Sequence, residues 1–245
     1  HYIIKKNIKH QISQHISDLG PIFIKFGQWI SNRVDLLGQD ISSKLSQLQN
    51  SNKIHSWNYT QYILKKYLPD FEQFLNITTE TIGSGSIAQV YQIKCNYNYP
   101  KIKTNQNQIM ALKIKHPRIT IQTQSSIYLL RILINFLKLH PNCKKIINSI
   151  NFDQFFKNIL KQCSIDQESN NLQLFEKTFR NNHLIIIPKY FYHNEHFLIE
   201  SYEEGYNLDN FIQLYPSKKS ETLSLLWWTF FIMTLQKNVI HGDLH

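Results

Sequence analysis

The stretch ITTETIGSGSIAQVYQIK, residues 77–94, decides the fold of this chain. Apolar and polar residues alternate on both sides of a Gly-Ser-Gly turn, and a period of two indicates two strands joined as a β-hairpin. The turn is built from small residues, which let backbone N–H groups come close to a bound anion. The candidate contacts in this stretch are Gly83, Ser84, Gly85, Ser86, Ala88 and Val90.

The turn also matches a pattern of nucleotide-binding loops. Protein kinases carry G-x-G-x-x-G-x-V between two strands, and GSGSIAQV (83–90) fits it except that Ala88 replaces the last glycine. In that arrangement the backbone would contact phosphates and Val90 would pack on the base. Short Gly-Ser hairpins also occur without any ligand, so the loop alone leaves both interpretations open. The other glycine-rich phosphate motif, G-x-x-x-x-G-K-[ST], does not occur in the chain.

Two charged residues further along are candidate partners of the loop. IMALKIK (109–115) predicts a third strand, in which Lys113 stands where kinases place the lysine that holds the α- and β-phosphates. A helix expected over about 151–180 carries Glu168, the candidate partner, because a buried ammonium group needs an opposite charge. A strand lysine that faces solvent and an exposed helical carboxylate remain the alternatives.

The C-terminal part of the chain supplies the other candidate site residues. HLIIIPKYFYHNEHFLIES (183–201) predicts two strands, and a polar hinge follows. Adenine would bond there with the backbone C=O of Glu200 and the N–H of Tyr202. The chain ends with VIHGDLH (239–245), and Asp243 in this His-x-Asp loop is the candidate catalytic base.

Helices are expected on both sides of this strand-rich centre. Residues 1–75 have apolar positions at helical spacing, a long helix is expected from Pro117, and two more are expected near 207–214 and 217–237. The most apolar run, LSLLWWTFFIMTL (223–235), is shorter than the roughly 20 residues that span a bilayer, so it predicts a buried core helix. The chain is therefore expected to be α+β, with three parts: a helical segment over 1–75, a strand-rich centre over 76–205 and a second helical segment over 206–245.

Charge and composition narrow the choice of partners. The formal net charge is +10, from 27 basic and 17 acidic residues, but the basic residues are scattered. No nucleic-acid partner is expected, because there is no basic stripe and no recognised module. The three cysteines show no C-x-x-C spacing, which favours a reducing compartment over a disulfide framework. Two histidine pairs, His193 with His196 and His241 with His245, lack further ligands, so no metal site is expected within this chain.

The segment LGPIFIKFGQWISNRVDLL (19–37) gives a more specific signal. Its Lys25-Phe26-Gly27-Gln28 is similar to the Lys-x-Gly-Gln signature of the UbiB family of atypical kinase-like proteins. The loop, the strand lysine and the His-Gly-Asp stretch also fall where that family has its own, so the resemblance covers essentially the whole chain. It implies a protein-kinase-like α+β fold that ends early in the C-lobe. An N-terminal helical extension carrying Lys25, Gly27 and Gln28 would pack over the active site.

The resemblance also implies a function. Family members look like atypical kinases or ATPases that bind ATP or ADP with Mg²⁺ and support ubiquinone or related lipid metabolism. Adenine nucleotide would be the ligand, with a membrane surface or an isoprenoid lipid as a further partner. The implied location is mitochondrial, peripheral to the inner membrane, with a plastid as the alternative. Asp243, Lys113 and Glu168 would be the catalytic residues.

Three departures from the family pattern keep a second interpretation open. The family has alanines where this chain has Gly83 and Gly85, and it has a Glu-x-Asp pair that anchors the signature lysine where this chain has Gln162 and Ser164. Asp166 is the candidate substitute for that pair. The Asn and Asp-Phe-Gly that would bind Mg²⁺ are expected beyond the last residue, so residues 1–245 alone are expected to show no turnover.

Two alternatives follow from these features. The first is a catalytically inactive pseudokinase scaffold that binds nucleotide or lipid, which the lost acidic pair favours. The second is a small-molecule phosphotransferase of the aminoglycoside or choline kinase type, whose loop also reads His-Gly-Asp. The Lys-x-Gly-Gln segment argues against that second alternative.

Overall fold

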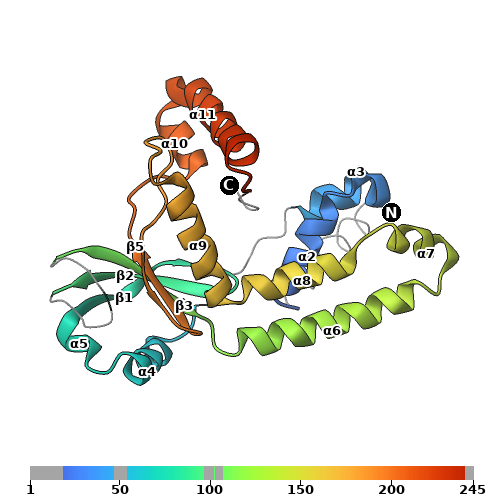
Figure 1. Cartoon of the computed structure of the whole chain (residues 1–245). Helices are drawn as coiled ribbons and strands as arrows, with labels where there is room; N and C mark the ends of the chain where they lie inside the picture. Colours follow the sequence, from blue (N-terminus) through green and yellow to red (C-terminus); the bar gives the residue numbers. More distant parts are fainter. Residues whose placement is uncertain (1–18, 47–53, 97–101, 103–106, 241–245) are drawn as a thin grey trace.

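The computed structural model describes residues 19–46, 54–96, 102 and 107–240. Its centre is an antiparallel sheet of five strands in the order β1-β2-β3-β5-β4 (Figure 1). The predicted hairpin and third strand are present, and the predicted α+β class is confirmed. The strands are β1 (Leu75–Ser84), β2 (Ala88–Cys95), β3 (Ile109–Lys115), β4 (Tyr190–His193) and β5 (Phe197–Ser201).

One face of the sheet forms the main apolar core. Tyr91 on β2 pairs with Leu112 on β3, which pairs with Ile199 on β5, and all three side chains are buried. Residues two apart on a strand share a face, so Lys113, one position from Leu112, projects from the opposite face. Leu64 and Phe71 pack on the core face. They belong to α4 (Trp57–Tyr67) and α5 (Phe71–Phe74), which lie below the sheet in Figure 1.

A group of helices, here called the helical arm, extends to one side of the sheet (Figure 1). Its own apolar core includes Ile22, Leu130 and Phe156. The rings of Trp29 and Phe155 stack with their centroids 4.3 Å apart, which joins the first helix of the arm to the last. The arm consists of α2 (Pro21–Ser31), α3 (Val34–Leu45), α6 (Ile119–Leu137), α7 (Pro141–Asn148) and α8 (Phe152–Gln162).

The prediction of one helix over about 151–180 is wrong, because the chain breaks there into two. Helix α8 ends at Gln162, and α9 (Ile165–Phe179) starts after two non-helical residues. Ser164 has an extended backbone, and its hydroxyl accepts the N–H of Gln167 at 3.2 Å. A serine N-cap of this kind satisfies an otherwise free donor at the start of a helix. It sets the direction of α9 independently of α8.

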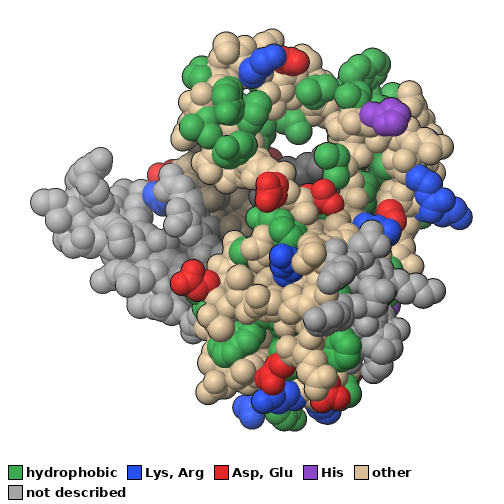
Figure 2. Space-filling model, turned by 90° about the vertical axis from the view of Figure 1, so that its left-hand side faces the viewer, with side chains coloured by type: hydrophobic (Ala, Val, Ile, Leu, Met, Phe, Trp, Pro, Cys, Tyr) green, Lys and Arg blue, Asp and Glu red, His purple; other side chains and the backbone are tan. Residues whose placement is uncertain are grey.

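The prediction of a buried core helix near the C-terminus is also wrong as to burial. The helix is present as α11 (Lys219–Phe231), but Trp227 and Trp228 are 64% and 60% exposed. Its neighbours are α10 (Leu208–Leu214), the 3₁₀ turn Pro216–Lys218 and the π-helical turn Ile232–Gln236, which are too short to cover it. Figure 2 shows hydrophobic side chains gathered at the top of the molecule, over α10 and α11. No helix in the described part of the chain has the length and apolar content to cross a membrane.

Candidate functional site

The candidate site is centred on the face of the sheet opposite the apolar core. Lys113 on β3 lies between Val90 on β2 and Leu198 on β5 in the strand register. Its ammonium group forms an ion pair with the carboxylate of Glu168 in the first turn of α9. The structure thus brings together the strand lysine and the helical glutamate, which stand 55 positions apart in the chain.

The charges around Lys113 explain its protonation. Burial alone would lower the pKa of Lys113, but the carboxylates of Glu168 and Glu200 outweigh it, so the pKa lies above its ordinary value. Burial raises the pKa of Glu200, an effect that the ammonium group of Lys113 partly offsets. The result is a charged ammonium group held between carboxylates, which is an arrangement suited to binding phosphate oxygens.

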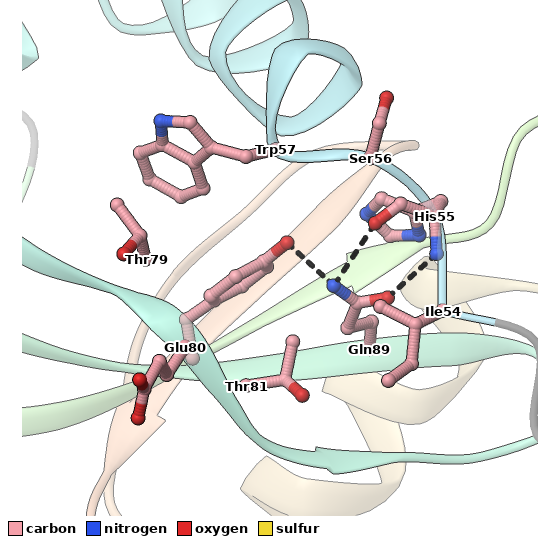
Figure 3. A pocket seen from close by; sticks show the side chains of 9 residues that line it. Ile54, His55, Ser56, Trp57, Thr79, Glu80, Thr81 and Gln89 are labelled. Atoms are coloured by element: carbon pink, nitrogen blue, oxygen red, sulfur yellow. Dashed lines mark hydrogen bonds between the residues drawn. The ribbon is translucent and has the colours of Figure 1, made fainter.

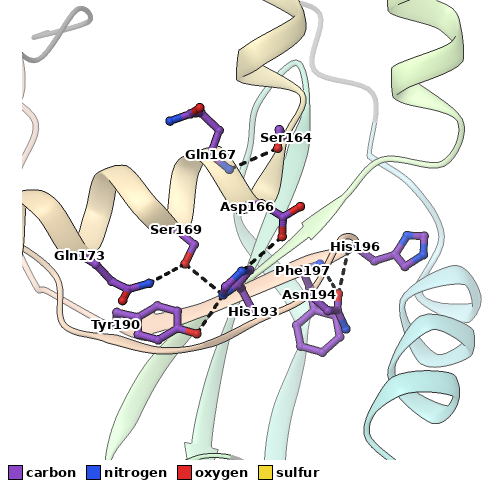
Figure 4. A network of polar contacts seen from close by, with 10 residues as sticks. All are labelled: Ser164, Asp166, Gln167, Ser169, Gln173, Tyr190, His193, Asn194, His196 and Phe197. Carbon is purple, nitrogen blue, oxygen red and sulfur yellow. Dashed lines mark hydrogen bonds and ion pairs between the residues drawn. The ribbon is translucent and has the colours of Figure 1, made fainter.

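A polar network fixes α9 against the sheet and so positions Glu168 (Figure 4). The Nδ1 atom of His193 on β4 lies 3.0 Å from the Ser169 hydroxyl and 2.8 Å from the Tyr190 hydroxyl. Its Nε2 atom lies 3.3 Å from Asp166. One of the two hydroxyls donates to the single lone pair of Nδ1 while Nε2–H donates to the carboxylate, which suits one neutral tautomer of His193. His193 therefore joins two side chains of α9 to the sheet edge.

The signature residues lie on α2 in the helical arm. The ammonium group of Lys25 donates to the amide oxygen of Gln162 at 2.6 Å, at the last residue of α8. The expected substitute, Asp166, contacts His193. Gly27 is buried, and Gln28 is half-buried with its carbonyl accepting the Ser31 hydroxyl at 2.6 Å. Lys25 thus bonds to the neutral amide of Gln162, six positions before Glu168 in the chain.

The loop between β1 and β2 forms a tight turn with open space at its glycines. The N–H of Gly85 donates to the carbonyl of Ala88 at 2.8 Å. A Cβ atom added at Gly83 would meet nothing within 4 Å, and one at Gly85 would make an ordinary contact of 3.7 Å with Ala88. The hydroxyl of Ser84 is buried without a hydrogen-bond partner among the described residues. Ser86 is half-buried beside it.

The hinge after β5 is fixed by the backbone of the segment before β4. The N–H of Ser201 donates to the carbonyl of Lys189 at 2.8 Å, and the Lys189 N–H donates to the Ser201 hydroxyl at 2.8 Å. That hydroxyl donates in turn to the carboxylate of Glu203. Glu200 and Tyr202 flank Ser201 and are half-buried. The candidate adenine contacts therefore lie on a segment that hydrogen bonds hold to Lys189, before β4, and to Glu203.

The candidate catalytic base, Asp243, lies outside the described residues, and so does His241 of the second histidine pair. In the part of the chain that the structure describes, no group of three His, Cys, Asp or Glu side chains could hold a metal ion. His193 contacts Asp166, Ser169 and Tyr190, and His196 lies 3.1 Å from Glu195.

Some contacts at the site have no counterpart in the sequence analysis. His116, just after β3, is bonded to the loop at Gly85 and Ile87, and its other ring nitrogen contacts His55. The contact between His116 and Gly85 spans 31 positions, so no local periodicity reveals it. A signal was available only in the position of His116, directly after the strand that carries Lys113.

Comparison with known proteins places this geometry in context. The model of the ABC1 atypical kinase-like domain matches residues 47–245. A probable serine/threonine-protein kinase abkC of Dictyostelium discoideum is 28% identical over 92% of this chain and 32% of its own length. The mitochondrial ABC1 family protein YPL109C of Saccharomyces cerevisiae is 26% identical over 92% of this chain and 37% of its own. A probable protein kinase UbiB of Providencia stuartii is 24% identical over 98% of this chain and 44% of its own.

The chain therefore spans less than half the length of these three relatives. Among solved structures, the complex of Rv3197 with erythromycin from Mycobacterium tuberculosis aligns with a TM-score of 0.48 and 13% identity. That alignment covers 86% of this chain and 52% of the other. A likeness at this level says nothing of function.

Proposed function

The chain belongs to the ABC1 atypical kinase-like family, and on that premise we propose that the protein binds an adenine nucleotide on the sheet face that carries Lys113. The phosphates would lie between the loop 83–88 and the Lys113 ammonium group, and the adenine would lie at the hinge, against Glu200 and Tyr202. The ion pair of Lys113 with Glu168 carries this proposal, because kinases use a strand lysine oriented by a helical glutamate to bind phosphates.

The loop leaves room for a nucleotide, whereas the described residues do not form a site for Mg²⁺. The space above Gly83 is open, so the loop backbone on the Lys113 side is accessible to a phosphate group. The resemblance to the UbiB family implies an Asn and an Asp-Phe-Gly as Mg²⁺ ligands, and no such Asp-Phe-Gly occurs among the described residues. ATP or ADP is therefore the ligand that these residues support.

The proposed activity is that of an atypical kinase or ATPase, with Asp243 as the base that accepts or orients the attacking hydroxyl. Supporting the metabolism of ubiquinone or a related lipid is the proposed role. It is favoured by similarity to proteins named UbiB. A mitochondrial location is favoured by similarity to a mitochondrial relative. The proposed position there is peripheral to the inner membrane, and a plastid is the alternative location. A membrane surface or an isoprenoid lipid is the proposed further partner.

Titration calorimetry of ADP binding to the full-length protein tests this proposal. Lys113→Ala removes a charged hydrogen bond worth about 1.5–3 kcal/mol, so we expect affinity to fall roughly 10- to 100-fold. Lys94→Ala is the matched control, because Lys94 is an exposed lysine at the other end of β2 from the loop. Equal affinity of the Lys113→Ala and Lys94→Ala variants would rule out phosphate binding at Lys113.

A catalytically inactive nucleotide-binding scaffold is the second candidate, and one contact favours it. Lys25 is held by the neutral amide of Gln162 where the resembling family places a carboxylate. Binding and turnover separate the two candidates in the full-length protein. Release of phosphate from ATP that is lost in an Asp243→Asn variant supports the kinase or ATPase. Tight nucleotide binding without turnover supports the scaffold.

A further inference from the structure

His116 holds the candidate nucleotide loop at two points. Its backbone N–H donates to the carbonyl of Ile87 at 2.8 Å, and its Nε2 atom lies 3.0 Å from the carbonyl oxygen of Gly85. Because a carbonyl oxygen only accepts, Nε2 must carry the hydrogen of this bond. The neutral imidazole then presents Nδ1 as an acceptor, and the Nδ1 atom of His55 lies 2.7 Å from it. His55 therefore donates from Nδ1.

The same series of contacts continues from His55 to side chains on the face of the sheet that forms the apolar core. The Nε2 atom of His55 lies 3.0 Å from the Thr60 hydroxyl, which lies 2.9 Å from the Tyr91 hydroxyl. The Gln89 amide nitrogen donates to Tyr91 at 2.5 Å. The oxygen of the same amide accepts the His55 backbone N–H at 2.9 Å. Figure 3 shows the amide of Gln89 beside His55, with dashed lines joining it to the His55 backbone.

Both ends of this relay impose the same direction on its hydrogens. At one end the backbone N–H of His55 fixes the orientation of the Gln89 amide, so its nitrogen must donate to Tyr91. The Tyr91 O–H then donates to Thr60, and the Thr60 O–H donates to His55 Nε2. At the other end the Gly85 carbonyl requires His55 to donate to His116. Every contact is satisfied when both imidazoles are neutral.

An added proton costs this relay one hydrogen bond. A hydrogen on Nδ1 of His116 would point at the Nδ1–H of His55 and break the contact between the two rings. A hydrogen on Nε2 of His55 would leave the Thr60 oxygen accepting from both His55 and Tyr91, so the Thr60 O–H would lose its acceptor in the relay. Tyr91, Thr60 and Gln89 are buried, so a lost bond there is costly.

We propose that His116 and His55 are positioning residues for nucleotide binding: as a neutral pair they tie the loop, at Gly85 and Ile87, to the segment before α4, and protonation of the pair breaks one of the contacts of this tie. This inference rests on the proposed nucleotide site. The other titratable groups around His55 are Tyr59 on α4, whose ring is 5.1 Å away edge-on, Tyr91 on β2, and Glu80 on β1 in the same pocket. Lys115 and Arg118 flank His116 in the chain. The imidazole–carboxylate pairs of the described residues involve His193 and His196 instead.

The environment of both rings favours the neutral state. Burial, helped by the proximity of His116, lowers the pKa of His55 to about 4. Burial also lowers the pKa of His116, against the opposing effect of the Gly85 carbonyl. A depressed histidine pKa means that the unfolded chain takes up the proton first. The stabilisation is therefore complete above the ordinary pKa of about 6.5 and is lost as the pH falls from there towards 4.

Nucleotide affinity of the full-length protein, measured with a fluorescent ADP analogue from about pH 7.5 down to about pH 4, tests the proposal because this range reaches the lowered pKa of His55 in the folded protein. Losing the bond to Gly85 in His116→Leu should weaken binding roughly three- to tenfold at the higher pH. His116→Gln keeps an amide donor that cannot titrate. It should restore affinity there and remove part of the loss that the wild type shows at the lower pH. His183→Gln, at an exposed histidine, should follow the wild-type profile.

Two results would overturn the proposal: unchanged affinity in His116→Leu, or identical pH profiles for the wild type and His116→Gln. If the wild type binds no nucleotide at either pH, the proposed function fails, and the relay is then decided by thermal unfolding. In that case a midpoint that falls with pH more steeply in the wild type than in His116→Gln supports the relay. Equal slopes refute it.

Discussion

Replacing Glu168 with Gln and Lys113 with Met, singly and together, measures how strongly the two charges are coupled. The side chains of Lys113 and Glu168 are 25% and 37% exposed, so the pair lies between two limits. Fully exposed pairs contribute about 0.2–1 kcal/mol, and removing one partner of a fully buried pair costs about 3–5 kcal/mol. We expect a coupling free energy of about 1–2 kcal/mol, each single variant being less stable than the wild type.

Urea-induced unfolding of the nucleotide-free full-length protein at neutral pH gives the four free energies of unfolding that this double-mutant cycle needs. The coupling free energy is the sum of the two stability losses of the single variants minus the stability loss of the double variant. Gln and Met keep most of the side-chain volume, so packing changes little. A coupling below about 0.3 kcal/mol, which is the limit for independent sites, would refute the reasoning.

Three further substitutions test other parts of the structure by the same unfolding measurement. Gln162→Glu gives Lys25 a charged acceptor and should stabilise the protein by about 0.2–1 kcal/mol; a less stable variant would contradict a direct contact between the two side chains. Trp29→Ala removes a half-buried ring from the core of the helical arm and should cost about 2–3 kcal/mol, somewhat below the range for fully buried aromatics. Its control, Trp227→Ala on the exposed face of α11, should change stability by less than about 0.5 kcal/mol, and equal losses in the two would argue against the arm core. Gly83→Ala should be neutral or stabilise by up to about 1 kcal/mol, because the added methyl meets nothing within 4 Å; a clear loss of stability would show that the loop cannot accept a side chain there.

The parts of the fold with a strict local period could be predicted from the sequence. The hairpin expected from the alternation at 77–94 is present as β1 and β2, and the strand expected at 109–115 is β3 with the same bounds. Period two is unambiguous when a Gly-Ser-Gly turn separates the two runs. The helix break at Ser164 was missed because a single capping serine interrupts a helical pattern that continues on both sides.

Contacts across long stretches of chain could not be predicted in the same way. The sequence suggested Asp166 as a partner of Lys25, but the position of Asp166 on the first turn of α9 places it beside His193. The burial of α11 was misjudged because apolar composition predicts what a helix tends to bury and not which neighbours are there to bury it. The pairing of Lys113 with Glu168 followed from the order of motifs along the chain, and its relation to His116 did not.

The break between α8 and α9 has a mechanical consequence for the candidate site. An 11-residue helix such as α8 is about 16 Å long, and the pair of non-helical residues after Gln162 can act as its hinge. Tilting the helix by about 10° about this hinge would displace its far end, at Phe152, by about 3 Å. Gln162, to which Lys25 is hydrogen-bonded, lies next to the hinge, where the same tilt produces almost no displacement. The signature lysine is thus attached at the part of the arm that moves least relative to Glu168.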